Sequence, residues 1–154
     1  MKSIIPTYSD LPIIQRILAG GSHCVSVIVG VPSLIITGSS VMFLICPVIS
    51  YLVCRKYRKI SSHWLSSQAF QGTIVNLILG LTIFMALEFN LPNGITLLML
   101  TASFITALYT LWGALDVILG FDFNYILIGK VSKKVSLINQ SRKKFEDPYL
   151  PTKK

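Results

Sequence analysis

Acidic residues are scarce in this chain, which has six of them against 14 lysines and arginines among 154 residues. They form no carboxylate or metal-binding cluster of the kind that a reaction would need. The sequence also lacks a glycine-rich phosphate loop, a Gly-x-Ser-x-Gly turn and a His-Glu-x-x-His pair. We therefore expect no enzymatic activity, no catalytic residue, no cofactor and no bound metal. The acids are Asp10, Glu88, Asp116, Asp122, Glu146 and Asp147.

Cysteine is also rare, and its three positions are odd in number and contain no Cys-x-x-Cys spacing. Cys24, Cys46 and Cys54 lie within or at the ends of apolar stretches. We interpret them as small apolar residues, without a redox role.

Charged residues of both signs make up only 13% of the chain, whereas 53% is hydrophobic and the mean hydropathy is +0.68. This leaves too little polar surface to coat a soluble globule, so the composition is typical of a membrane protein. The net charge of +8 is the only feature that would suit nucleic acid. Because its distribution has another explanation, given below, we expect no nucleic-acid partner.

Long apolar runs predict an all-α bundle of four transmembrane helices. A span needs roughly 20 apolar residues, and the run 11–54 is about twice that length, so it should contain two helices. Pro32 cannot donate a backbone hydrogen bond and Gly30 permits a tight reversal, which favours a turn at the sequence GVPS. The predicted spans are 11–30, 33–54, 67–87 and 95–119, within a membrane domain 1–138 that is followed by a basic polar tail 139–154.

Lysines and arginines are distributed unequally among the connecting segments. Such cations resist translocation and accumulate on the side from which a membrane protein is inserted. They occur near the start of the first span, in the loop 55–59 and after the fourth span, whereas the two short turns contain none. We therefore expect both termini and the basic loop on the side of synthesis, where the excess charge also attracts anionic lipid.

Small and polar side chains form a stripe along each predicted helix at 100° per residue. The stripes are Arg16, Gly20, His23 and Gly30; Ser33, Thr37, Ser40 and Tyr51; Gln68, Gln71, Val75 and Thr82; and Ala102, Thr106, Tyr109, Gly113, Asp116 and Gly120. Two interpretations stay open, because polar groups can link helices by hydrogen bonds or line a polar path. The candidates for either role are His23, Gln68, Gln71, Thr106, Thr110 and Asp116.

Two ionisable candidates illustrate the alternatives. His23 lies near the middle of its span, where a neutral imidazole could bond a neighbouring hydroxyl or take part in transport. Asp116 lies near the inner end of the fourth span, where it could meet water or the lysines of the tail or contribute to a path.

The chain resembles a known family over roughly residues 10–138. The basic loop is followed by HWLSSQAFQGTIVNLIL at the start of the third span, a short turn, the fourth span, and then DVILGFDFNYILIGKVSKKV. This order resembles the Tic-twenty family, the small four-span subunit of the protein-import translocon in the chloroplast inner envelope. In that family a His or Asn and an alanine- and glutamine-containing helix start precede span three, and a glycine with an xIPxIG-like segment closes span four. The matching residues are His63, Gln68, Ala69, Gln71, Gly120, Ile126, Ile128 and Gly129, whereas Leu127 stands where the family has proline.

The resemblance implies a subunit that helps to form a protein-conducting path. Its implied partners are the lipid bilayer, other translocon subunits and precursor polypeptides in transit, and self-association into a homo-oligomer is left open. The implied location is the plastid (chloroplast) inner envelope membrane, with both termini on the stromal side. Because MKSIIPTYSD is too short and too poor in Arg and Ser for a transit peptide, we expect a plastid gene.

The same pattern has a second interpretation. A related family of small bacterial four-span proteins shares both ends of the pattern, so the alternative is a protein of the bacterial inner membrane with a structural or regulatory role.

Overall fold

The computed structural model describes residues 8, 10–59, 63–126 and 128, and within these ranges it is all helical with no strand, as the sequence predicts. The tail 139–154 and Gly129 lie outside the described residues. The elements are α1 (Ile13–Gly21), a short π-helical segment η1 (Ser26–Gly30), α2 (Val31–Thr37), α3 (Met42–Lys59), α4 (His63–Glu88) and α5 (Asn93–Leu119).

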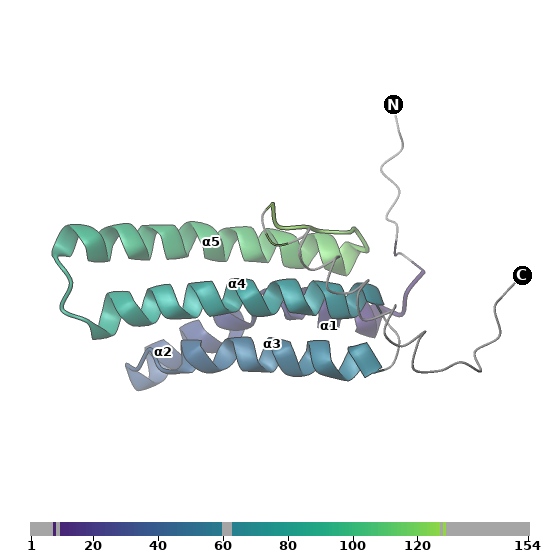
Figure 1. Ribbon diagram of the computed structural model, residues 1–154, viewed down its shortest axis with the longest axis horizontal. Coiled ribbons are helices and arrows are strands. Elements are labelled where there is room, and N and C mark those ends of the chain that lie inside the picture. The colour runs from purple at the N-terminus through teal and green to yellow at the C-terminus, as the bar shows by residue number, and fades with distance from the viewer. Residues whose placement is uncertain (1–7, 9, 60–62, 127, 129–154) are drawn as a thin grey trace, which may run out of the picture.

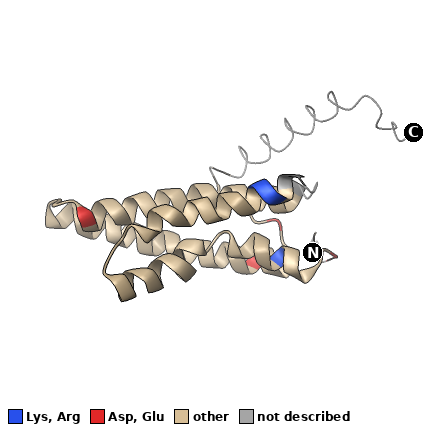
Figure 2. Ribbon diagram, turned by 90° about the horizontal axis from the view of Figure 1, so that it is seen from below, with Lys and Arg blue, Asp and Glu red and all other residues tan. Residues whose placement is uncertain are grey.

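The long helices α3, α4 and α5 run antiparallel to their neighbours (Figure 1), and α1 packs against α4 and α5. α1 begins at the end of the bundle where α5 finishes, because the Tyr8 amide donates to Gly120 O at 2.9 Å. The Arg16 guanidinium also donates to Ile118 O at 3.2 Å, which satisfies one of the open carbonyls in the last turn of α5. The described helices carry their lysines and arginines at this same end (Figure 2).

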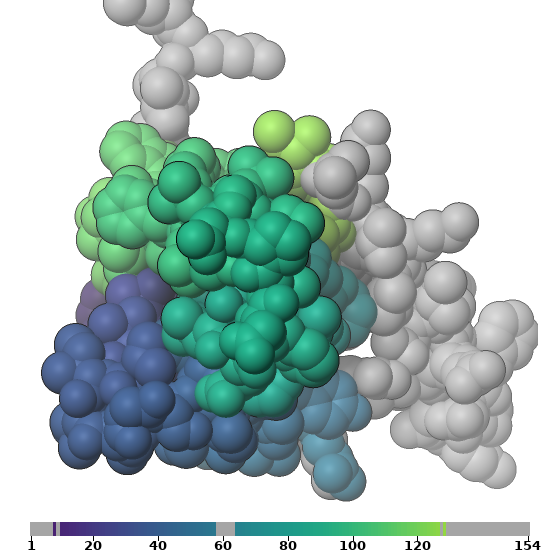
Figure 3. All heavy atoms as spheres, turned by 90° about the vertical axis from the view of Figure 1, so that its left-hand side faces the viewer, coloured from purple at the N-terminus to yellow at the C-terminus, as the bar shows by residue number. Residues whose placement is uncertain are grey.

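The opposite end of the bundle is formed by two tight connections that lie side by side (Figure 3). The Ser40 hydroxyl, between α2 and α3, donates to Glu88 Oε1 at the end of α4, at a distance of 2.6 Å. The end that carries the cations and the turns that contain none are thus at opposite poles, which is the arrangement that the distribution of cations predicts.

Two helices, α4 and α5, are long and apolar enough to cross a membrane. α1 and η1–α2 together would make a further span, which is the first along the chain, with a bend of 67° between its two halves. This bent pair is called the first span below. The predicted spans 67–87 and 95–119 correspond to α4 and α5, whose ends differ from the predictions by at most four residues.

The predicted turn at GVPS is wrong, and so are the boundaries 11–30 and 33–54. Helical structure continues from Ser26 through Pro32 to Thr37, and the chain reverses at Gly38, whose positive φ of 67° favours glycine. Proline is tolerated here because it stands in the first turn of α2, directly after a π-helical segment that widens the preceding turn and relieves the clash with the proline ring.

Glycines let α4 approach its neighbours at two points. A Cβ on Gly72 would collide with the carbonyl oxygen of Ser22, and a Cβ on Gly80 would collide with that of Phe43. Both the first span and α3 therefore pack closely against α4. An apolar cluster of Ala19, Trp64, Leu65 and Val117 fills the bundle near its charged end.

We predict that Gly72→Ala destabilises the protein, although alanine is normally the better helix residue. The added methyl group would push α4 away from Ser22, at a cost of about 1–3 kcal/mol. Gly94→Ala is the matched control, since no atom lies within 4 Å of the position that a Cβ would take there, and no loss is expected. Thermal unfolding of both variants in detergent, followed by circular dichroism, tests this; equal midpoints would contradict the close approach.

Candidate functional site

The bend of the first span is built around the side chain of Asn76 in α4. In an unbroken α-helix the Ser26 amide would donate to the carbonyl of Ser22, four residues earlier. Instead Ser26 N donates to Asn76 Oδ1 at 2.9 Å, and Asn76 Nδ2 donates to Ser22 O at 2.8 Å. The side-chain amide is thus inserted into one turn of the helix, which is an established cause of a sharp kink.

Two further groups, the Ser50 hydroxyl and the Gly72 carbonyl, complete this contact. Asn76 Nδ2 also lies 3.1 Å from Ser50 Oγ in α3 and 2.7 Å from Gly72 O in its own helix. The Ser50 hydroxyl in turn donates to Ser22 O at 2.8 Å. The asparagine and Ser50 are fully buried. Three elements, the first span, α3 and α4, are therefore joined by neutral hydrogen bonds inside the bundle.

His23 lies directly after Ser22 in the bend and is also fully buried. Its Nε2 lies 3.0 Å from Gln68 Oε1, and its Nδ1 lies 3.1 Å from the hydroxyl of Tyr125. Gln68 Nε2 donates to Asp122 Oδ1 and to Phe123 O, each at 3.0 Å, which identifies Oε1 as the acceptor. Hence His23 is assigned as the Nε2–H tautomer, which donates to Gln68 and accepts from Tyr125.

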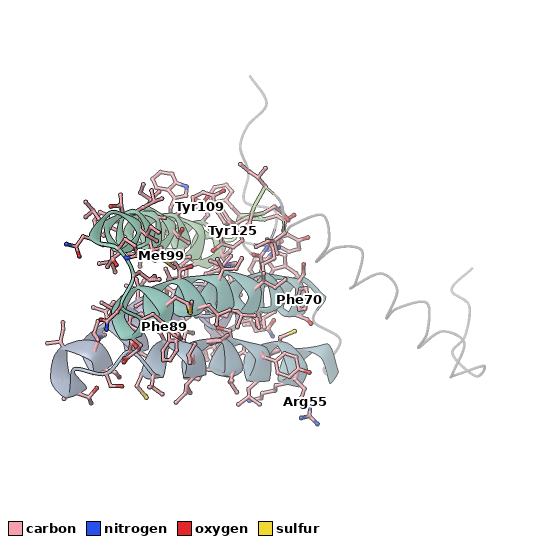
Figure 4. All side chains as sticks on the ribbon, turned by 60° about the vertical axis from the view of Figure 1, so that its left-hand side comes forward. Arg55, Phe70, Phe89, Met99, Tyr109 and Tyr125 are labelled. Carbon is pink, nitrogen blue, oxygen red and sulfur yellow. The ribbon has the colours of Figure 1, made fainter. Side chains whose placement is uncertain are left out.

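Gln71 completes the site from the next turn of α4. Its Oε1 accepts from the backbone amide of Tyr125 at 3.2 Å, whereas its buried Nε2 has no hydrogen-bond partner. Tyr125 lies beside Tyr109 (Figure 4), with ring centroids 5.4 Å apart. The predicted candidates His23, Gln68 and Gln71 are thus brought together, against residues that follow α5.

The other predicted residues lie elsewhere or outside this cluster. Thr110 is buried but bonds Ala107 O of its own helix at 2.7 Å, and Thr106 bonds Ala102 O at 2.8 Å. Asp116 is half-buried in the last turns of α5. Ala69 is fully buried between Gln68 and Phe70, and Gly120 ends α5 with a φ of 94°. His63 begins α4, but its side chain lies outside the described part of the structure, as does Gly129.

The predicted stripes are only partly internal. The helix faces are rotated from the predicted arcs, so several members are exposed: Thr37, Tyr51, Ala102 and Tyr109. For the arc of the second span the physical reason is the misplaced boundary. Ser33 and Thr37 belong to α2, which bends away from α1 and buries no residue. The polar interior is therefore built by the first span, α3, α4 and the residues after α5.

Sequence reasoning missed Asn76, Ser22, Ser50 and Tyr125. Asn76 stands about 80° from Gln68 on the helical wheel and so lies outside the predicted arc. Its signal was its chemistry, because an amide in the middle of a long apolar helix needs a partner. Tyr125 had a different signal: in FDFNYI aromatic residues alternate with Asp122 and Asn124, the period of an extended segment.

Chemically, the site offers neutral amide, imidazole and hydroxyl groups in apolar surroundings, together with the part-buried carboxylate of Asp122. The neutral groups can bond water or a polypeptide main chain without the cost of burying a charge. No protein-family model, curated protein or solved structure matches the chain. The likeness to the Tic-twenty family therefore depends on the residues named above.

We predict that Asn76→Leu destabilises the protein by about 2–4 kcal/mol, because Ser26 N would lose its acceptor and Ser22 O one of its donors inside the bundle. Ile78→Ala is the matched control in the same helix, since Ile78 is half exposed and should cost less than about 1 kcal/mol. Unfolding in detergent with increasing dodecyl sulfate measures both changes. A loss for Asn76→Leu no larger than that of the control would contradict the proposed clamp.

Proposed function

We propose that this chain is a four-span subunit of the protein-import translocon in the plastid inner envelope, where it contributes to a protein-conducting path. One observation carries the proposal. Four of the residues responsible for the family resemblance lie together: Gln68 and Gln71 bond His23 and Tyr125 in one buried cluster, Ala69 is buried beside them, and Gly120 turns the chain toward it, whereas Ile126 is exposed. A polar cluster inside an apolar bundle is the feature that passage of a polypeptide would require.

Three of the four proposed spans are supported by the lengths of the described helices. α4 and α5 contain 25 and 27 residues in their apolar stretches, enough for a bilayer core of about 30 Å at 1.5 Å per residue. The bent pair α1 and η1–α2 would supply another span. α3 has a shorter apolar part, from Met42 to Cys54, and would reach the interface through the long side chains of Arg55 and Lys56.

Exposure along α5 supports assembly with other subunits or copies of the chain. Only 11% of the apolar stretch of α5 is buried, compared with 39% for α4. Two small or hydroxyl-bearing residues of its predicted stripe, Ala102 and Tyr109, remain exposed. Small residues at such positions allow close contact between helices in a membrane.

We predict that the charged end of the bundle faces the side of synthesis. In a variant with Cys24, Cys46 and Cys54 replaced by alanine, Lys56→Cys should react with a membrane-impermeant thiol reagent added from that side of sealed vesicles. Asn93→Cys should react only from the opposite side, because the turn before α5 contains no cation. Both positions are exposed. Labelling of both cysteines from one side would rule out the four-span topology.

The proposed function predicts that affinity purification of the tagged chain from native membranes recovers other translocon subunits together with a precursor arrested in transit. Gly94→Ala, which changes an exposed residue at the start of α5, should recover them equally well and controls for the tag and the expression level. Recovery of the folded chain without any of these partners would favour the alternative, a bacterial-type membrane protein with a structural or regulatory role.

A further inference from the structure

The segment 121–126, here named the strap, folds back into the bundle after α5. Gly120 reverses the chain with its positive φ, and Phe121 N bonds Asp116 O at 2.9 Å. Figure 1 shows the strap turning back beside the C-terminal half of α5. Tyr125 within it is only 5% exposed. A non-helical segment therefore places one buried aromatic side chain among the helices.

Two glutamines of α4 hold the strap through its main chain. Gln68 donates to the carbonyl oxygen of Phe123, and Gln71 accepts from the amide of Tyr125, two residues later. In an extended chain the carbonyl of one residue and the amide of the next but one point to the same side. Phe123 N bonds Phe121 O at 3.2 Å, so the strap begins with a tight turn. Gln68 and Gln71, three residues apart on one helix face, then bond the main chain of residues 123–125 in the pattern that a neighbouring strand would use.

The side chains of the strap fit a surface of aromatic and small residues. Gly113 leaves room for Phe123, because a Cβ at Gly113 would come 2.6 Å from the phenylalanine ring. The ring centroid of Tyr125 lies 5.4 Å from the ring centroid of His23 and 5.4 Å from that of Tyr109. The Tyr125 hydroxyl also bonds His23 Nδ1. The site therefore accepts an extended peptide with large aromatic or apolar side chains at alternate positions.

The fit of the strap is incomplete at two buried atoms, Gln71 Nε2 in α4 and Asn124 Oδ1 in the strap itself. Gln71 Nε2 is buried without a hydrogen-bond partner, and an unpaired buried donor costs about 1–3 kcal/mol. A different peptide that presents a carbonyl to this nitrogen would recover that loss. This donor and the main-chain contacts both indicate a site for polypeptide whose present occupant is replaceable.

We propose that His23, Gln68 and Gln71 form a binding site for an extended polypeptide segment, and that the strap occupies this site in cis as a displaceable stand-in. The inference rests on the proposed function for its biological setting, where a precursor in transit would replace the strap. The contacts that define the site are independent of any translocon partner, so binding can be tested on the chain alone.

The first experiment uses the full chain in lipid nanodiscs and a fluorescent peptide with the sequence of residues 120–126. Phe123→Ala combined with Tyr125→Ala weakens the hold of the strap and should tighten apparent peptide binding about tenfold, because the tethered competitor then occupies the site less often. Trp112→Ala removes an exposed aromatic residue of α5 and should bind like the wild type. Adding Gln68→Leu and Gln71→Leu to the released variant should reduce binding to background.

A matched peptide tests recognition of the main chain. Methylation of the nitrogen that corresponds to Tyr125 removes the donor for Gln71 and leaves the side chains unchanged, so this peptide should bind at least about tenfold more weakly. Equal binding of the two peptides, or no tightening in a released variant that still elutes as a folded species, would overturn the proposal.

A second measurement leaves the contacting side chains intact in case the released variant does not fold. In the variant without native cysteines, Asn124→Cys reports on the strap, and saturating peptide should raise its rate of labelling by a soluble thiol reagent several-fold. An unchanged rate would overturn the proposal. Peptide binding without recovery of translocon subunits would reject the proposed function alone, whereas recovery without peptide binding would reject only this inference.

Discussion

The amide of Asn76 is the interaction on which the rest of the structure depends. It takes the place of one backbone hydrogen bond in the first span, between Ser26 N and Ser22 O, and so converts a helix into two halves bent by 67°. In hydrocarbon, a helix can break only where the freed backbone groups find other partners. Asn76 supplies one for each group, and Gly72 allows α4 to come close enough to do so.

The bend determines where the polar groups of the bundle gather. It carries His23 to a position between α4 and the strap, and it directs α2 away, so that the buried residues Ser22, His23 and Ser26 all belong to the broken turn. Apolar packing at Ala19 and Leu65 lies toward the charged end. The result is a layer of neutral hydrogen bonds within an otherwise apolar bundle, which is costly to disturb because an unpaired polar group has no water to replace its partner.

The sequence was sufficient to predict the helical class and the two longest helices. It also placed His23, Gln68 and Gln71 in one set of candidate residues. Those features follow from long apolar runs and from polar side chains one turn apart, which are local patterns. The turn at Gly30–Pro32 was wrong because proline suits the first turn of a helix as well as it suits a break, and only the neighbouring π-helical turn decides between them. The roles of Asn76 and Tyr125 depend on contacts across 50 or more positions of the chain, which no helical wheel can reveal.

The unequal apolar lengths of α3 and α5 have a consequence for the surrounding lipid. An apolar stretch that is shorter than the hydrocarbon core draws the head groups inward, and a longer one is accommodated by tilting. In a four-span arrangement α3, with Pro47 inside it and Arg55 and Lys56 near its end, would thin the bilayer on one flank, whereas the 27 residues of α5 span the full thickness on another. Under the proposed function, a thinner membrane beside the basic end of α3 would shorten the distance over which a polar chain must be shielded from lipid.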